Sequence, residues 1–219
     1  MGNRSEWAAP QGCYPCAGND RWAVISCADD AEFGRMADAM GHGEWKDDPR
    51  FATVLARRDN HDALDEAISA WTSQRDHYDV MHTLQAAGVK AAPVLDGKEI
   101  LFDPHFKARG QFDIVEQPRL GKRPIPRHLG AKFGRFVAQA RSHAPTLGEH
   151  NEEVLAELGY STEEIASLKE AGAVANEPKL PVPAQFVSAG LKLPYDRYVE
   201  HGILLGIDDD YREQLGIAD

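Results

Sequence analysis

Residues 13–27, CYPCAGNDRWAVISC, place two short apolar runs on either side of a turn signal. The runs are residues 13–16 and 22–27, and Gly18-Asn19-Asp20 separates them. Glycine, asparagine and aspartate favour tight turns because they tolerate left-handed backbone angles. Apolar runs joined in this way are typical of a β-hairpin. We therefore predict a hairpin here and assign the other elements outward from it.

Three amphipathic helices are predicted after the hairpin. Their apolar residues recur at three- and four-residue steps, which places them on one helical face. These faces are Phe33, Met36, Ala37 and Met40, then Leu64, Ile68 and Trp71, and then Val80, Met81 and Leu84. Asp29 or Asp30 can cap the first helix, and Gly41 follows it as a left-handed stop. Residues 42–51 are predicted to form a loop.

The next segments complete an α+β fold class. Residues 89–95 are predicted to form a short extended segment at a strand edge or end, because Pro93 cannot donate to a central ladder. Strands are predicted at 112–115 and 133–137, with an extended arginine- and proline-rich arm over 117–130 between them. Two further helices follow, because Thr146-x-x-Glu149 and Ser161-x-x-Glu164 match the capping box. Residues 173–219 show little periodicity, and we expect this tail to cover a partner surface.

Bulk properties limit the function classes. The 219 residues carry a formal net charge of −11, which disfavours a general nucleic-acid binder because phosphate binding needs a basic surface. The sequence has no apolar run of about 18 residues and no signal peptide, so it predicts a cytoplasmic protein that does not bind membranes.

Two local patterns have both a chemical and a structural interpretation. Cys13 and Cys16 match C-x-x-C, which zinc sites and thioredoxin-like motifs share. Further ligands at suitable spacing are missing and a turn follows, so reduced, buried thiols in a strand are favoured. Asp208-Asp209-Asp210 lacks the alternation and terminal glutamate of a calcium loop, and a solvated helix start is favoured. No metal site is predicted.

Three stretches carry a family resemblance through their order and spacing over about 170 residues. They are residues 2–4 with 9–22, residues 50–60 with 87–94 and 103–105, and residues 144–159, which include APQGCYPCAG, DPH and LGEHN. Together they resemble family III (CaiB/BaiF-type) CoA-transferases, the formyl-CoA and carnitine CoA-transferase group. The match is to the carboxyl-terminal half of such enzymes.

The resemblance implies a protein that is incomplete by itself. Members have a large Rossmann-like domain that binds CoA, a small α+β domain, and a segment that returns to the large domain. Two such chains interlock as rings. The expected domains here are residues 1–12 as a linker and active-site loop, 13–110 as the small domain, 111–172 as the return arm and helices packing on the large domain, and 173–219 as a tail extension.

The resemblance also implies a chemistry. In the family an aspartate carboxylate attacks an acyl-CoA thioester, and an aspartyl-CoA thioester then passes CoA to a second carboxylic acid. The position of that aspartate precedes Gly2, so we expect a companion chain to carry it and assign no catalytic residue here. No tightly bound cofactor is expected, since the coenzyme A thioester is a substrate. An acidic surface repels CoA, so its phosphates need a local basic patch or another chain.

The segment from Gly2 to Gly12 lies where some members have a glycine-rich loop over the reacting aspartate. We predict that Asn3, Arg4, Gln11 and Gly12 bind substrate, with Arg4 pairing with a carboxylate. The alternative for Arg4 is that it only braces the linker. His105 and His150 match family positions, and capping or interface hydrogen bonding is favoured over catalysis for both.

Two other functions compete with the split transferase. One is a subunit of a 2-methylacyl-CoA racemase-type isomerase, which uses an acid–base pair to enolise the thioester. The other is a non-catalytic scaffold or a truncated fragment. The GNR and YPCAG stretches favour the transferase.

Overall fold

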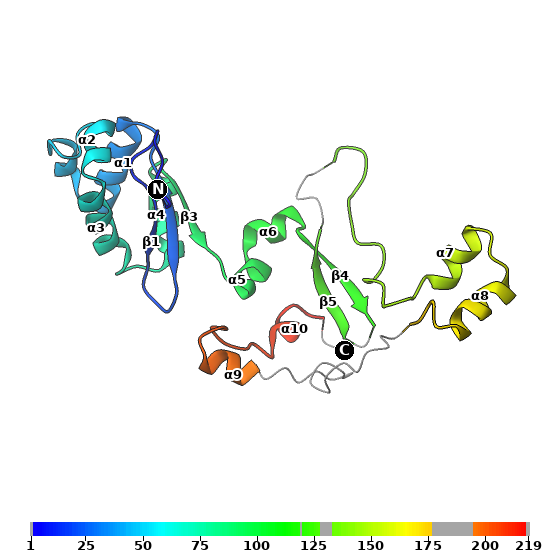
Figure 1. Ribbon diagram of the computed structural model, residues 1–219. Coiled ribbons are helices and arrows are strands. Elements are labelled where there is room, and N and C mark those ends of the chain that lie inside the picture. Colours follow the sequence, from blue (N-terminus) through cyan, green and yellow to red (C-terminus); the bar gives the residue numbers. More distant parts are fainter. Residues whose placement is uncertain (1, 119, 128–132, 177–194, 218–219) are drawn as a thin grey trace. The chain divides into compact units, whose positions relative to one another are not determined.

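The computed structural model describes residues 2–118, 120–127, 133–176 and 195–217. These residues belong to two compact units, Met1–Asp96 and Gly97–Asp219 (Figure 1). Helices and antiparallel strands occur in both units, so the predicted α+β class is confirmed. The four-part division predicted from the sequence stays a prediction.

The first unit contains a three-stranded antiparallel sheet. Strand β1 (Gln11–Pro15) pairs with β2 (Trp22–Ser26), and β2 pairs with β3 (Lys90–Val94). The predicted hairpin is confirmed, and its turn includes Asp20 in the left-handed region with φ 53°. Strand β3 lies at an edge of the sheet, where the missing N–H of Pro93 is tolerated.

Four helices accompany this sheet: α1 (Asp30–Met40), α2 (Val54–Asp59), α3 (His61–Thr72) and α4 (His77–Ala86). The three predicted helices are confirmed. The Asp29 carboxylate caps α1 by accepting from the Glu32 amide, and Gly41 ends it with φ 80°. Helix α2 and a 3₁₀ turn over Gly43–Lys46 were not predicted. The loop prediction for 42–51 is therefore wrong in part, because burial of Trp45 stabilises a helical turn there.

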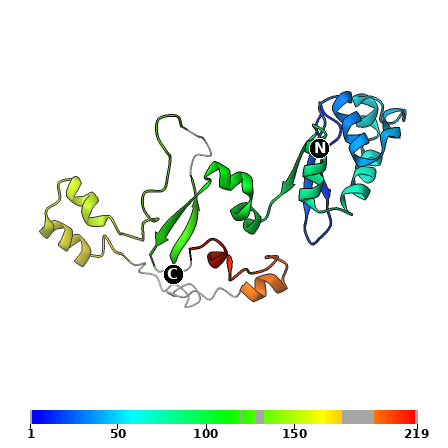
Figure 2. The same ribbon diagram turned by 180° about the vertical axis from the view of Figure 1, so that it is seen from behind.

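The core of the first unit lies between the sheet and its helices. Helix α3 contacts β1, and α4 contacts β2 and β3. Figure 2 shows the helices from the reverse direction. Because side chains alternate along a strand, Tyr14, Ala23 and Ile25 face this core and are buried. They pack with helical residues that include Phe33, Met36, Leu64, Ile68, Val80 and Leu84.

The opposite face of the sheet is not covered within this unit. Cys13, Val24 and Ala92 form one row across the three strands, and Pro15, Trp22 and Val94 form the next. Trp22, Val24 and Val94 are 37%, 41% and 44% exposed. An apolar sheet face with this exposure is a candidate contact surface.

The second unit begins with two short helices and a hairpin. Helices α5 (Gly97–Phe102) and α6 (Pro104–Arg109) precede strands β4 (Phe112–Gln117) and β5 (Gly121–Pro126). Strand β4 confirms the strand predicted at 112–115. The prediction of an extended arm over 117–130 is wrong for residues 121–126, because these residues form β5 and pair with β4. Arg127 donates to Asp113 Oδ1 at 2.8 Å and joins the ends of this hairpin.

The remaining helices are α7 (Asn151–Glu157), α8 (Thr162–Glu170), α9 (Tyr195–Glu200) and α10 (Tyr211–Gln214). The Ser161–Glu164 capping box is confirmed at the start of α8. The Thr146–Glu149 box does not begin α7, whose N-cap is His150, although Glu149 does bond Thr146. Residues 133–137 do not form the predicted strand, because none of the strands that the structure describes pairs with them.

The tail is partly described. Asp210 precedes α10, as the predicted helix start requires, and Asp208 forms an ion pair with Lys98 of α5. The proline-rich part of the tail lies outside the described residues. Among the helices that the structure describes, none is long and apolar enough to cross a bilayer.

Candidate functional site

The segment before β1 is fastened to α3 through Arg4. Its Nε and Nη2 donate to Asp65 Oδ2 at 3.1 and 2.6 Å, and Nη2 also donates to Asp62 Oδ1 at 2.5 Å. The two aspartates are one helical turn apart, so both carboxylates lie on the same side of α3. These bonds raise the pKa of Arg4, with Asp62 as the larger cause and Asp65 next, and they hold the guanidinium charged.

Asp65 has a second partner in the hairpin. Tyr14 donates its hydroxyl to Asp65 Oδ1 at 2.9 Å, so both oxygens of this carboxylate accept hydrogen bonds. Burial, followed by the nearby Asp65 charge, raises the pKa of Tyr14 and keeps its phenol a neutral donor. His61 Nε2 lies 3.5 Å from the same Oδ1, and burial lowers the pKa of His61.

Gly12 makes this arrangement possible. Gly12 and Tyr14 lie on the same face of β1, and the tyrosine ring lies over the glycine to reach Asp65. A Cβ at Gly12 would lie 2.7 Å from the Cζ and hydroxyl oxygen of Tyr14, which is shorter than real contacts allow. The absence of a side chain at residue 12 is therefore a packing requirement.

The four residues predicted to bind substrate lie together. Asn3, Arg4, Gln11 and Gly12 all line a cavity of about 270 Å³ that reaches Asp65. Asn3, Gln11 and Gly12 also line a larger open groove of about 710 Å³, which extends over β2 and β3. This groove has the size of a small-molecule site, with apolar walls and a few polar groups.

A row of polar side chains crosses the uncovered sheet face at the groove. The strand register places Gln11, Ser26 and Lys90 side by side, one from each strand. Lys90 Nζ bonds both oxygens of Glu32, at 2.9 and 2.7 Å. Burial opposes ionisation of Glu32, but bonds from Ala28 and Lys90 prevail and lower its pKa. The groove therefore combines neutral hydrogen-bonding groups with one paired cation.

Comparison with known proteins identifies the family. A family model described as CoA-transferase family III matches residues 1–151. The chain belongs to CoA-transferase family III. It is 35% identical over 169 residues to succinyl-CoA–D-citramalate CoA-transferase of Chloroflexus aurantiacus. That match covers 77% of this chain and 42% of the relative.

Two further family members give the same result. The succinyl-CoA–L-malate CoA-transferase beta subunit of Chloroflexus aurantiacus is 31% identical over 166 residues, which cover 75% of this chain and 41% of that subunit. The crystal structure of a CaiB/BaiF family protein from Brucella suis is 32% identical with a TM-score of 0.58. That match covers 72% of this chain and 40% of the Brucella suis protein. The chain thus spans less than half the length of these relatives.

Some residues of the candidate site were not found from the sequence. Asp65 and Tyr14 were missed, because two residues 51 positions apart give no local signal. Ser26 and Lys90 follow only from the strand register. Cys13 was expected to be buried, yet it is half-exposed and lines both cavities.

Other chemical predictions can be compared with the geometry. The three cysteines are free thiols, and burial raises the pKa of Cys16 to about 11 and that of Cys27 to about 12. The backbone of His105 lies in the Asp103 cap of α6, and the His150 ring contacts Glu153 at 3.1 Å. Within the described ranges, no cluster of three or more histidine, cysteine or acidic residues could hold a metal ion.

Proposed function

We propose that this chain supplies the carboxyl-terminal half of a split CoA-transferase. A companion chain would carry the Rossmann-like large domain, the CoA site and the nucleophilic aspartate. The observation that carries the proposal is the family match over residues 1–151, combined with coverage of only 42% of a full-length relative. The proposed complex is a cytoplasmic, interlocked assembly.

The proposed reaction moves CoA from an acyl-CoA to a free carboxylic acid. The companion's aspartate forms a mixed anhydride with the acyl group and releases CoA thiolate. The thiolate then attacks the aspartyl carbonyl, which gives an aspartyl-CoA thioester and frees the first acid. The second acid reverses these steps, so bonds broken and formed balance without another reagent.

The contribution of this chain is recognition of the acids. Asn3, Gln11 and Ser26 offer hydrogen bonds at the groove, and Arg4 offers a cation beside it. An arginine is suited to a substrate carboxylate because a hydrogen bond from its charged N–H groups to a carboxylate oxygen is stronger than a neutral one. We propose that the reacting thioester and acid occupy the groove, with the companion's aspartate at its open side.

Exposed apolar residues support the need for a companion. In the second unit, Leu147, Val154 and Leu158 are 59%, 49% and 70% exposed. In the first unit, the sheet face with Trp22 and Val24 is uncovered. Apolar areas of this kind mark protein contacts. One relative also carries a subunit designation in its name, the beta subunit of the L-malate enzyme.

Activity is expected only from the complex. Succinyl-CoA is the donor of choice for a first assay, with citramalate and malate as acceptors, because two relatives act on these acids by name. CoA exchange should occur when this chain and the large-domain chain are combined, and neither chain should exchange alone. The measurement is chromatographic quantification of the new acyl-CoA.

The control is the companion chain with its nucleophilic aspartate changed to asparagine, which should abolish exchange in the complex. A companion that is fully active alone would contradict the proposal. Isomerisation of a 2-methylacyl-CoA without exchange would instead support the racemase alternative.

A further inference from the structure

The segment before β1 is held at two points. At its end, Cys27 N donates to Pro10 O at 2.9 Å, and Arg57 Nε donates to Ala9 O at 2.6 Å. At its beginning, Arg4 binds α3. Between these points, the one hydrogen bond of the described structure is local, from Trp7 N to Ser5 Oγ. The position of Arg4 therefore depends on the aspartates of α3.

The two aspartates are not equivalent. The side chain of Asp62 is 92% exposed and makes one bond to Arg4, so water competes with that bond. The side chain of Asp65 is 27% exposed and accepts two bonds from Arg4 through Oδ2. Its other oxygen is held by Tyr14, which is itself buried. Asp65 is thus the ordered carboxylate that fixes Arg4.

The bonds leave part of the guanidinium for a ligand. Arginine has five N–H donors, and the aspartates are bound through Nε and Nη2. The two N–H groups of Nη1 remain for an oxygen in the cavity that Arg4 lines. A brace on α3 and a contact to substrate are therefore compatible roles for Arg4.

We infer that Asp65 is a positioning residue for recognition of the substrate carboxylate. It holds Arg4 at the cavity, and Tyr14 holds Asp65, so the hairpin and α3 together fix the orientation of the cation. This inference rests on the proposed function, because the carboxylate is the acid that receives CoA. Asp65 acts through Arg4, because both of its carboxylate oxygens already accept hydrogen bonds, from Arg4 and from Tyr14.

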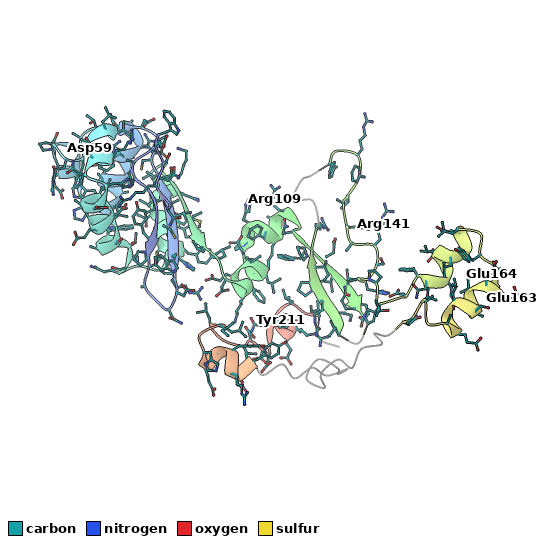
Figure 3. All side chains as sticks on the ribbon, in the orientation of Figure 1. Asp59, Arg109, Arg141, Glu163, Glu164 and Tyr211 are labelled. Atoms are coloured by element: carbon teal, nitrogen blue, oxygen red, sulfur yellow. The ribbon has the colours of Figure 1, made fainter. Side chains whose placement is uncertain are left out.

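The test compares Asp65→Asn with Asp59→Asn in the complex with the companion chain. Asp59 lies at the end of α2, is exposed and has no role in the network (Figure 3). Asp65→Asn keeps the shape but removes the charge, and we expect KM for the acceptor acid to rise about tenfold, which corresponds to about 1.4 kcal/mol. KM for the acyl-CoA and kcat should change less than twofold. Asp59→Asn should change none of these values.

A second measurement does not depend on activity. Amide hydrogen exchange of residues 2–9 in the isolated chain should be faster in Asp65→Asn, while exchange in α1 stays at the wild-type rate. Asp65→Glu retains the charge and should recover part of the protection. Equal exchange rates and equal acid KM in Asp65→Asn and wild type would overturn the inference. If the wild-type complex shows no transfer, the proposed function fails, and the exchange rates still decide whether Asp65 orders the segment.

Discussion

Replacing Arg57 with methionine is expected to lower the free energy of unfolding of residues 1–96 by about 2–6 kcal/mol, about 1–3 kcal/mol for each buried carbonyl that loses its donor. Arg57 is 0% exposed, and its three nitrogens donate to Ala9 O, Phe51 O and Asp30 Oδ1 at 2.6, 2.8 and 2.7 Å. Its guanidinium carbon also lies 4.2 Å from the centroid of the Phe33 ring. Methionine fills similar space but leaves the two buried carbonyls without a donor.

Chemical denaturation followed by tryptophan fluorescence measures this effect. All four tryptophans lie in the first 96 residues, and Trp45 and Trp71 are buried, so the signal reports this unit. The matched control is Arg58→Met, the same substitution at an exposed neighbour, for which we expect a change within about 0.5 kcal/mol. Equal stability of the two variants would show that the Arg57 network does not hold the unit together.

Gly12→Ala is expected to destabilise the same unit by about 1–3 kcal/mol. The new methyl group would lie 2.7 Å from the ring of Tyr14, which is 2% exposed and has little room to move. Displacing the ring also breaks the bond between Tyr14 and Asp65. The same denaturation experiment detects the loss.

Gly34→Ala is expected to have the opposite effect and to stabilise the same unit. Gly34 lies inside α1, and a Cβ there would meet only the flexible side chain of Lys46 at 3.4 Å. Alanine is a better helix former than glycine, so this variant should gain up to about 1 kcal/mol. If Gly12→Ala were as stable as Gly34→Ala, the close approach of Tyr14 to Gly12 would not be a constraint.

The elements of the first unit could be predicted wherever local chemistry was sufficient. Gly18-Asn19-Asp20 indicated the hairpin, and Asp29 and Gly41 marked the ends of α1, because turns and caps depend on neighbouring residues. Helix α2 was missed, since its six residues are too few to show a period. Strand β5 was missed because its two prolines disfavour a strand, and its pairing with β4 is visible only in the structure.

Some residues of the candidate site could likewise be predicted from the sequence, and others could not. The resemblance to the family pointed to Asn3, Arg4, Gln11 and Gly12, and the fold brings these residues to one cavity. Their role as substrate ligands stays a prediction. The burial of Arg57 could not be predicted from the sequence, because arginine is rarely fully buried. The Tyr14–Asp65 bond joins β1 to α3, so only the tertiary structure reveals it.

The central claim is that this chain works as one half of a two-chain enzyme, and the native mass of the co-expressed proteins tests it most directly. The account predicts a stable complex that contains both chains in equal numbers, with a mass equal to their sum or a multiple of it. Size-exclusion chromatography coupled to native mass spectrometry provides the measurement. Separate elution of the two chains, with transferase activity in the companion alone, would contradict the account.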